Sequence, residues 1–263
     1  MRIIQSALLL TACTICFYSC IDTEEYIEVH DDNSGVYTIK MDMGKMLELA
    51  SQFGGQGNAS QKPMPNLDTV ILFKDAVAAS GKLTAAEKEL YKDGSFKVTI
   101  DSARNVFRIA VSCPFKQISQ LPEIKDNLFN MVEKLGINDV VEGKSKKGDK
   151  NSELSLLDKD VSETVNPTSK GYQFTAVPGK IANINKSTDT NLLASDSIMQ
   201  MMQQMTMFTG DMTLTTVIKL PRSVKTITNK KAELSADRKL ITLVNTLTDL
   251  IEKPEDGAYE LEY

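Results

Sequence analysis

The sequence predicts an α+β protein in which antiparallel β-sheet is packed by helices on one face. Apolar and polar residues alternate along several short segments, a pattern typical of strands with one buried and one wet face. Amphipathic segments with helix start and stop signals lie between them. Segments 101–123 and 235–255 also share the order turn, strand, apolar anchor and proline. This weak repeat suggests two related halves. The alternative is that both segments simply follow the common order of hairpin and helix.

The expected strands share this alternation of apolar and polar residues. In the last of them, Tyr259, Leu261 and Tyr263 alternate with Glu260 and Glu262. The expected strands are 37–43, 96–101, 107–113, 172–176, 212–220, 240–243 and 259–263.

The expected helices have boundary signals at their ends. Thr84 stands three residues before Glu87, which is the spacing of a capping box. Pro122 opens another helix, and Gly136 ends it. The expected helices are 45–53, 84–91, 122–135, 197–208 and 248–252.

The start of the chain has the three parts of a secretory signal. Met1 and Arg2 precede an apolar run that extends to Phe17, and Ser19 is followed by Cys20. This combination resembles a bacterial lipoprotein signal, in which the cysteine receives a diacylglycerol and becomes the new N-terminus. We therefore expect a signal peptide over 1–19 and lipidation at Cys20. Cys13 is the alternative, but cleavage there would leave a very short apolar core. The apolar run is also too short for a transmembrane anchor.

The residues that follow Cys20 bear on where the protein lies. Segment 21–25 is acidic and resembles the export signal of surface lipoproteins of Bacteroidetes, although Thr23 interrupts the acids. The alternative is a solvated acidic tether. We expect an outer-membrane protein anchored by its lipid, with the surface-exposed and periplasm-facing locations both open.

The expected organisation follows from these signals. Segment 20–34 is an acidic tether, 35–137 a first α+β half, 138–169 a polar linker and 170–263 a second α+β half. The linker is polar and charged, with few residues that could pack into a core.

The composition argues against several classes of function. The formal net charge of −5 argues against nucleic acid as a partner. His30 is the only histidine, so a catalytic triad or a typical zinc site cannot be built from it. Phosphate-binding glycine motifs are absent from the sequence. We expect no enzyme activity, no cofactor and no metal site. Cys113 continues an apolar strand face and should be a buried, inert thiol.

A methionine-rich segment follows the expected strand 172–176 and leads into the expected strand 212–220. Six methionines fall between Met199 and Met212. Their helical spacing favours a core stripe. The alternatives are an apolar groove for a lipid or peptide, lined by Met201, Met205 and Phe208, or a copper(I) site.

Three tripeptides match the pattern of O-glycosylation in Bacteroidetes, an Asp followed by Ser or Thr and a small or apolar residue. They make Thr69, Ser102 and Ser197 candidate glycosylation sites. Turn or helix-cap chemistry is the alternative at each. Segment 31–35 supplies oxygens and a glycine, but a turn explains it better than a calcium site.

Several segments together resemble a family of uncharacterised Bacteroidetes lipoproteins. They are 33–37 (NSGVY), 41–46 (MDMGKM), 83–88 (LTAAEK), 220–225 (LPRSVK) and 234–237 (LSAD). The resemblance implies a location and a fold class but no catalytic position. A fainter one is to mycobacterial lipoproteins of the LppM type, whose soluble domain has been linked to lipid binding. We expect a non-catalytic binding or assembly module with a lipid or protein partner. The alternative is a lipid or lipoprotein carrier with an apolar cavity near the methionine-rich helix.

Overall fold

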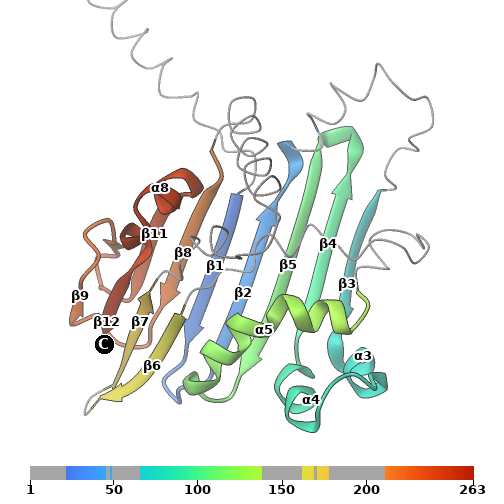
Figure 1. Cartoon of the computed structure of the whole chain (residues 1–263), viewed down its shortest axis with the longest axis horizontal. Helices are drawn as coiled ribbons and strands as arrows, with labels where there is room; N and C mark the ends of the chain where they lie inside the picture. Colours follow the sequence, from blue (N-terminus) through green and yellow to red (C-terminus); the bar gives the residue numbers. More distant parts are fainter. Residues whose placement is uncertain (1–21, 46–47, 49–65, 138–161, 169–170, 178–210) are drawn as a thin grey trace, which may run out of the picture.

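The computed structural model describes residues 22–45, 48, 66–137, 162–168, 171–177 and 211–263. Most of these residues belong to two β-sheets (Figure 1). The larger sheet has eight strands in the order β10 (Glu233–Leu234), β11 (Leu240–Thr246), β8 (Thr213–Lys219), β1 (Asp22–Val29), β2 (Gly35–Asp42), β5 (Val106–Phe115), β4 (Ser95–Asp101) and β3 (Leu67–Leu72). The smaller sheet has four, in the order β6 (Ser162–Thr168), β7 (Gly171–Val177), β12 (Tyr259–Glu262) and β9 (Thr226–Ile227).

The larger sheet is antiparallel except at its centre, where β1 and β8 run parallel. Four α-helices lie within the described residues, and they are α3 (Phe73–Ala79), α4 (Ala85–Tyr91), α5 (Leu121–Lys134) and α8 (Leu247–Glu252). Helix α5 and the smaller sheet lie over the same face of the larger sheet, while α3 and α4 lie at one end of it (Figure 1). The predicted α+β fold is thus confirmed.

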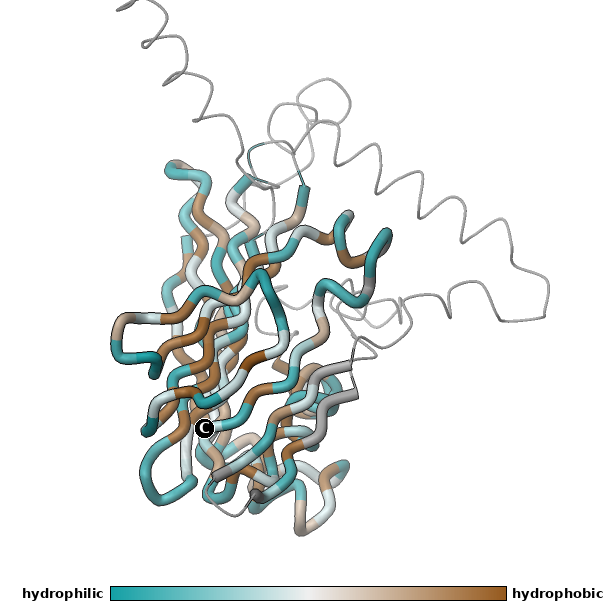
Figure 2. Tube along the Cα trace, turned by 90° about the vertical axis from the view of Figure 1, so that its left-hand side faces the viewer, coloured by the Kyte–Doolittle hydropathy of each residue, from teal (hydrophilic) through white to brown (hydrophobic). Residues whose placement is uncertain are grey.

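One hydrophobic core fills the space between these layers. On β4, Phe96, Val98 and Ile100 are buried, whereas the residues between them are not. Helix α5 buries Ile124, Leu128 and Met131 on one face, and Phe174 and Leu261 of the smaller sheet belong to the same core cluster. Figure 2, which views the molecule from its side, shows hydrophobic and hydrophilic residues alternating along the strands. Burial of each large apolar side chain contributes about 1.5–3 kcal/mol.

The boundary signals of α4 work as the sequence predicts. The Thr84 hydroxyl accepts a hydrogen bond from the Glu87 N–H at 3.2 Å, and the Glu87 carboxylate accepts one from the Thr84 N–H at 2.7 Å. Both orphan donors of the first turn are therefore satisfied by the capping box. Expected helix 122–135 corresponds to α5 and 248–252 to α8, whereas 197–208 and most of 45–53 lie outside the described residues.

The predicted acidic tether over 20–34 is wrong for most of its length. Asp22–Val29 forms β1, which lies between β2 and β8 inside the larger sheet. Thr23, Ile27 and Val29 face the core and are buried, while the acids Asp22, Glu24 and Glu28 occupy the other face. The acidic composition is that of a wet strand face rather than of a solvated segment.

Two other expectations about organisation change. Ser162–Thr168 forms β6, although this stretch is polar and was expected to belong to the linker over 138–169; residues 138–161 lie outside the described part. Strands of both expected halves share the larger sheet, because it contains β2, β5, β4 and β3 of the first half and β8, β11 and β10 of the second.

Candidate functional site

Most of the site residues expected from the sequence cannot be placed. Cys20, Ser197, Met201, Met205 and Phe208 lie outside the described residues. Lipidation at Cys20, glycosylation at Ser197 and an apolar groove in the methionine-rich segment therefore stay predictions.

Thr69 and Ser102 are described, and both have structural surroundings. Thr69 pairs with Val98 across β3 and β4 and is half-buried. Ser102 begins the short helix η2 (Ser102–Arg104) in the turn between β4 and β5, and its N–H donates to Asn66 Oδ1 at 3.2 Å. The preceding Asp101 caps this turn by accepting from the Arg104 N–H at 3.2 Å. Glycosylation at Thr69 and Ser102 stays a prediction.

The face of the larger sheet that points away from the core carries a shallow hollow of about 510 Å³. Its floor consists of small side chains on adjacent strands. Ser95 of β4 pairs with Ser112 of β5, which pairs with Thr38 of β2. The hydroxyls of Thr38 and Ser112 are hydrogen-bonded at 2.9 Å, and Ala110 follows on the same face. The hollow forms because three neighbouring strands all place small residues at the same level. We call this face, with its hollow, the open face.

Tyr26 borders the hollow and is held by charged neighbours. Its hydroxyl donates to Glu28 Oε2 at 3.2 Å, and Lys219 Nζ lies 2.9 Å from Glu28 Oε1. Lys40 Nζ lies 5.7 Å from the centre of the Tyr26 ring and 2.6 Å from Glu24 Oε1. Burial and the nearby Glu28 carboxylate raise the pKa of Tyr26. The hydrogen bond from Lys219 lowers the pKa of Glu28, and Glu28 in turn raises the pKa of Lys219.

The large hydrophobic residues that are exposed in the described part all lie on the open face. Val70 and Leu72 of β3 are 55% and 68% exposed. Val244 and Leu240 of β11 are 50% and 36% exposed. In each strand these residues alternate with half-buried or buried ones, which point to the core. The open face therefore has apolar margins on both sides of a small, polar centre.

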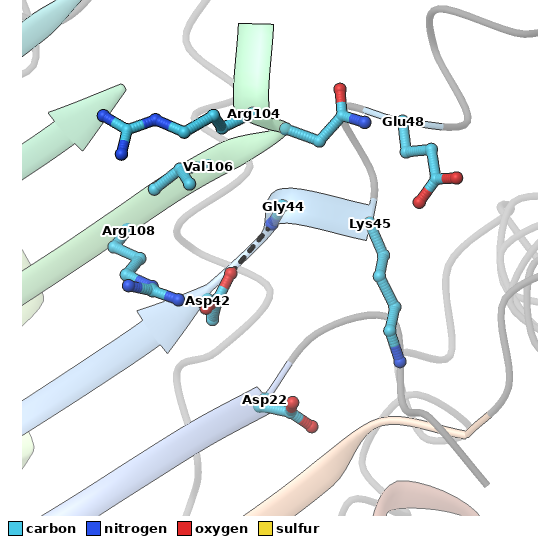
Figure 3. Close-up of a pocket in the computed structure, with 9 residues that line it drawn as sticks. Asp22, Asp42, Gly44, Lys45, Glu48, Arg104, Val106 and Arg108 are labelled. Atoms are coloured by element: carbon cyan, nitrogen blue, oxygen red, sulfur yellow. Dashed lines mark hydrogen bonds and ion pairs between the residues drawn. The ribbon is translucent and has the colours of Figure 1, made fainter. Parts of the chain in front are cut away.

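A second, charged pocket of about 330 Å³ lies at the end of the larger sheet where β1 begins. The acids Asp22, Asp42 and Glu48 line it together with the basic residues Lys45, Arg104 and Arg108. Figure 3 shows these side chains around the turn that follows β2. No local pattern in the sequence indicates this pocket, because its residues come from three segments that the fold brings together.

Hydrogen bonds fix the backbone and the acids at this end. Asp42 accepts from Arg108 Nε at 2.7 Å with one oxygen and from the Gly44 N–H at 3.0 Å with the other. A Cβ atom at Gly44 would collide with the carbonyl oxygen of Asn105. Asn105 has a φ of 53°, in the left-handed region, and lets the chain turn from η2 into β5. Glycine is therefore required where the two turns touch.

An ion pair lies inside the protein between β1 and α5. Lys125 Nζ is 2.6 Å from Glu25 Oε1, and the two side chains are 10% and 13% exposed. The Tyr37 hydroxyl donates to Glu25 Oε1 at 3.0 Å, and the Thr216 hydroxyl donates to Oε2 at 3.2 Å. The carboxylate thus joins β1, β2, β8 and α5. Glu25 looked like part of a tether in the sequence, so nothing there pointed to this role.

Two buried polar atoms near this ion pair lack a hydrogen-bond partner. They are Thr23 Oγ1 of β1 and Asn245 Oδ1 of β11. Thr23 and Asn245 both pair with Leu214 of β8, so they flank it on the core face of the sheet. Unsatisfied buried polar groups are costly, and they mark a level of the core that is not fully apolar.

The described part of the chain contains one free cysteine. Cys113 is fully buried, as the sequence predicts, and burial raises the pKa of its thiol to about 12. A thiol with such a pKa is a poor nucleophile. Among the described residues, no group of three or more His, Cys, Asp or Glu side chains could hold a metal ion. Within the same ranges, none of the helices has the length and apolar character needed to cross a membrane.

Comparisons with known proteins found few similarities. No family model matches the chain, and a search of curated proteins found no match. Among solved structures, the chain is similar to the folded domain of LppM from Mycobacterium tuberculosis, with a TM-score of 0.36 and 9% sequence identity. The similarity covers 92% of this chain and 89% of that domain. This similarity assigns no family to the chain.

Proposed function

We propose that this protein is a non-catalytic, lipid-anchored lipoprotein outside the cytoplasm, where it acts as a binding or assembly module at the outer membrane. The signal over 1–19 and the cysteine that follows it support the anchor at Cys20. The buried thiol of Cys113 is a poor nucleophile, which supports a non-catalytic role.

The composition and exposure of the open face support a role in binding. The opposite face of the same sheet is already covered by α5 and the smaller sheet, which together complete the core. The open face carries the hollow beside Tyr26 and exposed aliphatic side chains at its margins. A half-buried aromatic, small residues that allow close approach and a set of exposed aliphatics are typical of a surface that binds another protein. We therefore propose a protein partner for this face.

Ala110→Glu tests this proposal by filling the hollow from its floor. Ala110 pairs with Lys97 on β4 and with Lys40 on β2, so the new carboxylate would lie between two lysines and should leave the fold intact. The matched control is Ala78→Glu, which makes the same change at an exposed position of α3, away from the open face.

The readout is photo-crosslinking from position 70, at the margin of the open face, in membranes of the native host. We expect one defined protein to be crosslinked in the parent chain and in Ala78→Glu, and to be lost in Ala110→Glu. Equal crosslinking in all three chains would refute binding at the hollow. Native mass spectrometry of residues 22–263, purified from the native host, provides a second check, because a lipid that co-purifies and is lost on denaturation would favour the carrier alternative.

A further inference from the structure

We propose that the end of the larger sheet where β1 begins rests on the phospholipid headgroups of the anchoring membrane, so that the strands stand upright on it. This inference rests on the lipid anchor at Cys20 that forms part of the proposed function. The folded part of the protein would then have one fixed orientation relative to the membrane.

The chain between the lipid anchor and the first strand is very short. Only Ile21 separates Cys20 from Asp22, the first residue of β1. Asp22 is fixed in the sheet on both sides, opposite Asp42 of β2 and Thr213 of β8. Two extended residues span at most about 7 Å. The headgroup region of a bilayer leaflet is itself about 5–7 Å thick. The end of the sheet that holds Asp22 must therefore lie at the membrane surface.

The side chains at that end of the sheet have charges that fit a phospholipid headgroup. The charged pocket next to Asp22 brings together basic side chains, which fit a lipid phosphate, and acidic ones, which fit the ammonium group of an ethanolamine headgroup. Arg108 and Arg104 each use Nε for a carboxylate, of Asp42 and Asp101, yet their side chains are 64% and 80% exposed. Guanidinium groups bind phosphate oxygens well in such positions. The pocket thus suits a zwitterionic phospholipid headgroup.

An upright sheet has a consequence for the open face. The strands extend from this end of the sheet to the far end, where α3 and α4 lie (Figure 1). The open face then stands at right angles to the membrane, where a partner that diffuses along the same membrane can reach it. The lipid anchor and the binding face would work together in this arrangement.

Fluorescence quenching by spin-labelled headgroups tests the orientation. The lipidated full chain is placed in vesicles of phosphatidylethanolamine and phosphatidylglycerol, with a fluorophore on Ala103→Cys or, in a matched sample, on Gly81→Cys. Ala103 is exposed at the membrane end, and Gly81 is exposed at the far end, in a position with room for a side chain. The seven residues of β4 alone separate the two ends by about 23 Å. Cys113 is buried and should not be labelled.

We expect the label at position 103 to be quenched several-fold more strongly than the label at position 81. A flexible insert of about ten Gly and Ser residues before Asp22 adds roughly 18 Å of reach and should remove the difference. Replacing Arg104 and Arg108 with Gln should lower the docked fraction about fivefold per arginine. The control pair, Lys74→Gln with Lys82→Gln at the far end, should leave quenching unchanged.

Two results would overturn the proposal, and intact mass spectrometry of the same sample tells them apart. Equal quenching at both positions on a chain whose mass includes the lipid would refute the fixed orientation and leave the anchor in place. A mass without lipid on Cys20 would refute the anchor itself, and the orientation with it.

Discussion

Glu25 of β1 and Lys125 of α5 form an ion pair of 2.6 Å in the interior of the protein, where 13% and 10% of their side chains are exposed. The Tyr37 and Thr216 hydroxyls complete the hydrogen bonding of the carboxylate. Loss of one partner leaves a buried charge uncompensated, which costs more than the pair itself contributes.

Lys125→Met should therefore lower the free energy of unfolding by about 3 kcal/mol. Chemical denaturation of residues 22–263 measures this change. The double variant Glu25→Leu with Lys125→Met should recover much of the loss, because both charges are then gone. If the single and the double variant were equally destabilised, the charge of Glu25 would not be the cause.

Strands such as β4 and the helix α4 could be predicted from the sequence because their signals are local. Alternation along 96–101 or the Thr84 and Glu87 cap needs only neighbouring residues. β1 could not be recognised, because its outward acids continue the acidic run after Cys20 and its pairing partner β8 begins only at Thr213. Both pockets were equally hard to predict, because residues far apart in the sequence line them. The small residues Ala110 and Ser112 on the wet side of a strand were the one signal that could have indicated the hollow.

Glu87 should make the stability of the protein depend on pH in the acidic range. Hydrogen bonds from Lys134 and from the Thr84 N–H lower the pKa of Glu87 to about 2 from an ordinary value of 4.5. Because the folded-state pKa is depressed, the stabilisation is complete above pH 4.5 and is lost as the pH falls from 4.5 towards about 2. Carboxyl NMR titration of Glu87 measures this directly.

Lys134→Met provides the matching control for that titration. It removes the 2.7 Å ion pair, so the pKa of Glu87 should move up towards its ordinary value. The difference in stability between Glu87→Gln and the parent chain should shrink as the pH falls through the same range. A titration of Glu87 that Lys134→Met leaves unchanged would contradict the assigned cause.

Thr23→Val should stabilise the protein by about 1 kcal/mol. The buried Thr23 hydroxyl has no hydrogen-bond partner, and valine has the same shape without the polar atom. Thr38→Val is the matched control on the neighbouring strand, because it removes the 2.9 Å hydrogen bond to Ser112 and should be destabilising. Thermal and chemical unfolding of both variants give the two signs. Destabilisation by both would mean that the Thr23 hydroxyl does have a partner.

Gly44→Ala should destabilise the end of the larger sheet where β1 begins, whereas Gly81→Ala should not. A Cβ atom at Gly44 meets the backbone oxygen of Asn105, which cannot move without disturbing the turn into β5. A Cβ atom at Gly81 meets nothing within 4 Å. We expect a loss of about 1–3 kcal/mol for Gly44→Ala, as for other overpacked sites. Gly81→Ala should be neutral or slightly stabilising, since alanine restricts the unfolded chain. Hydrogen exchange of β2 and β5 amides localises the effect, and if Gly44→Ala left their protection unchanged, the contact with Asn105 would not constrain this turn.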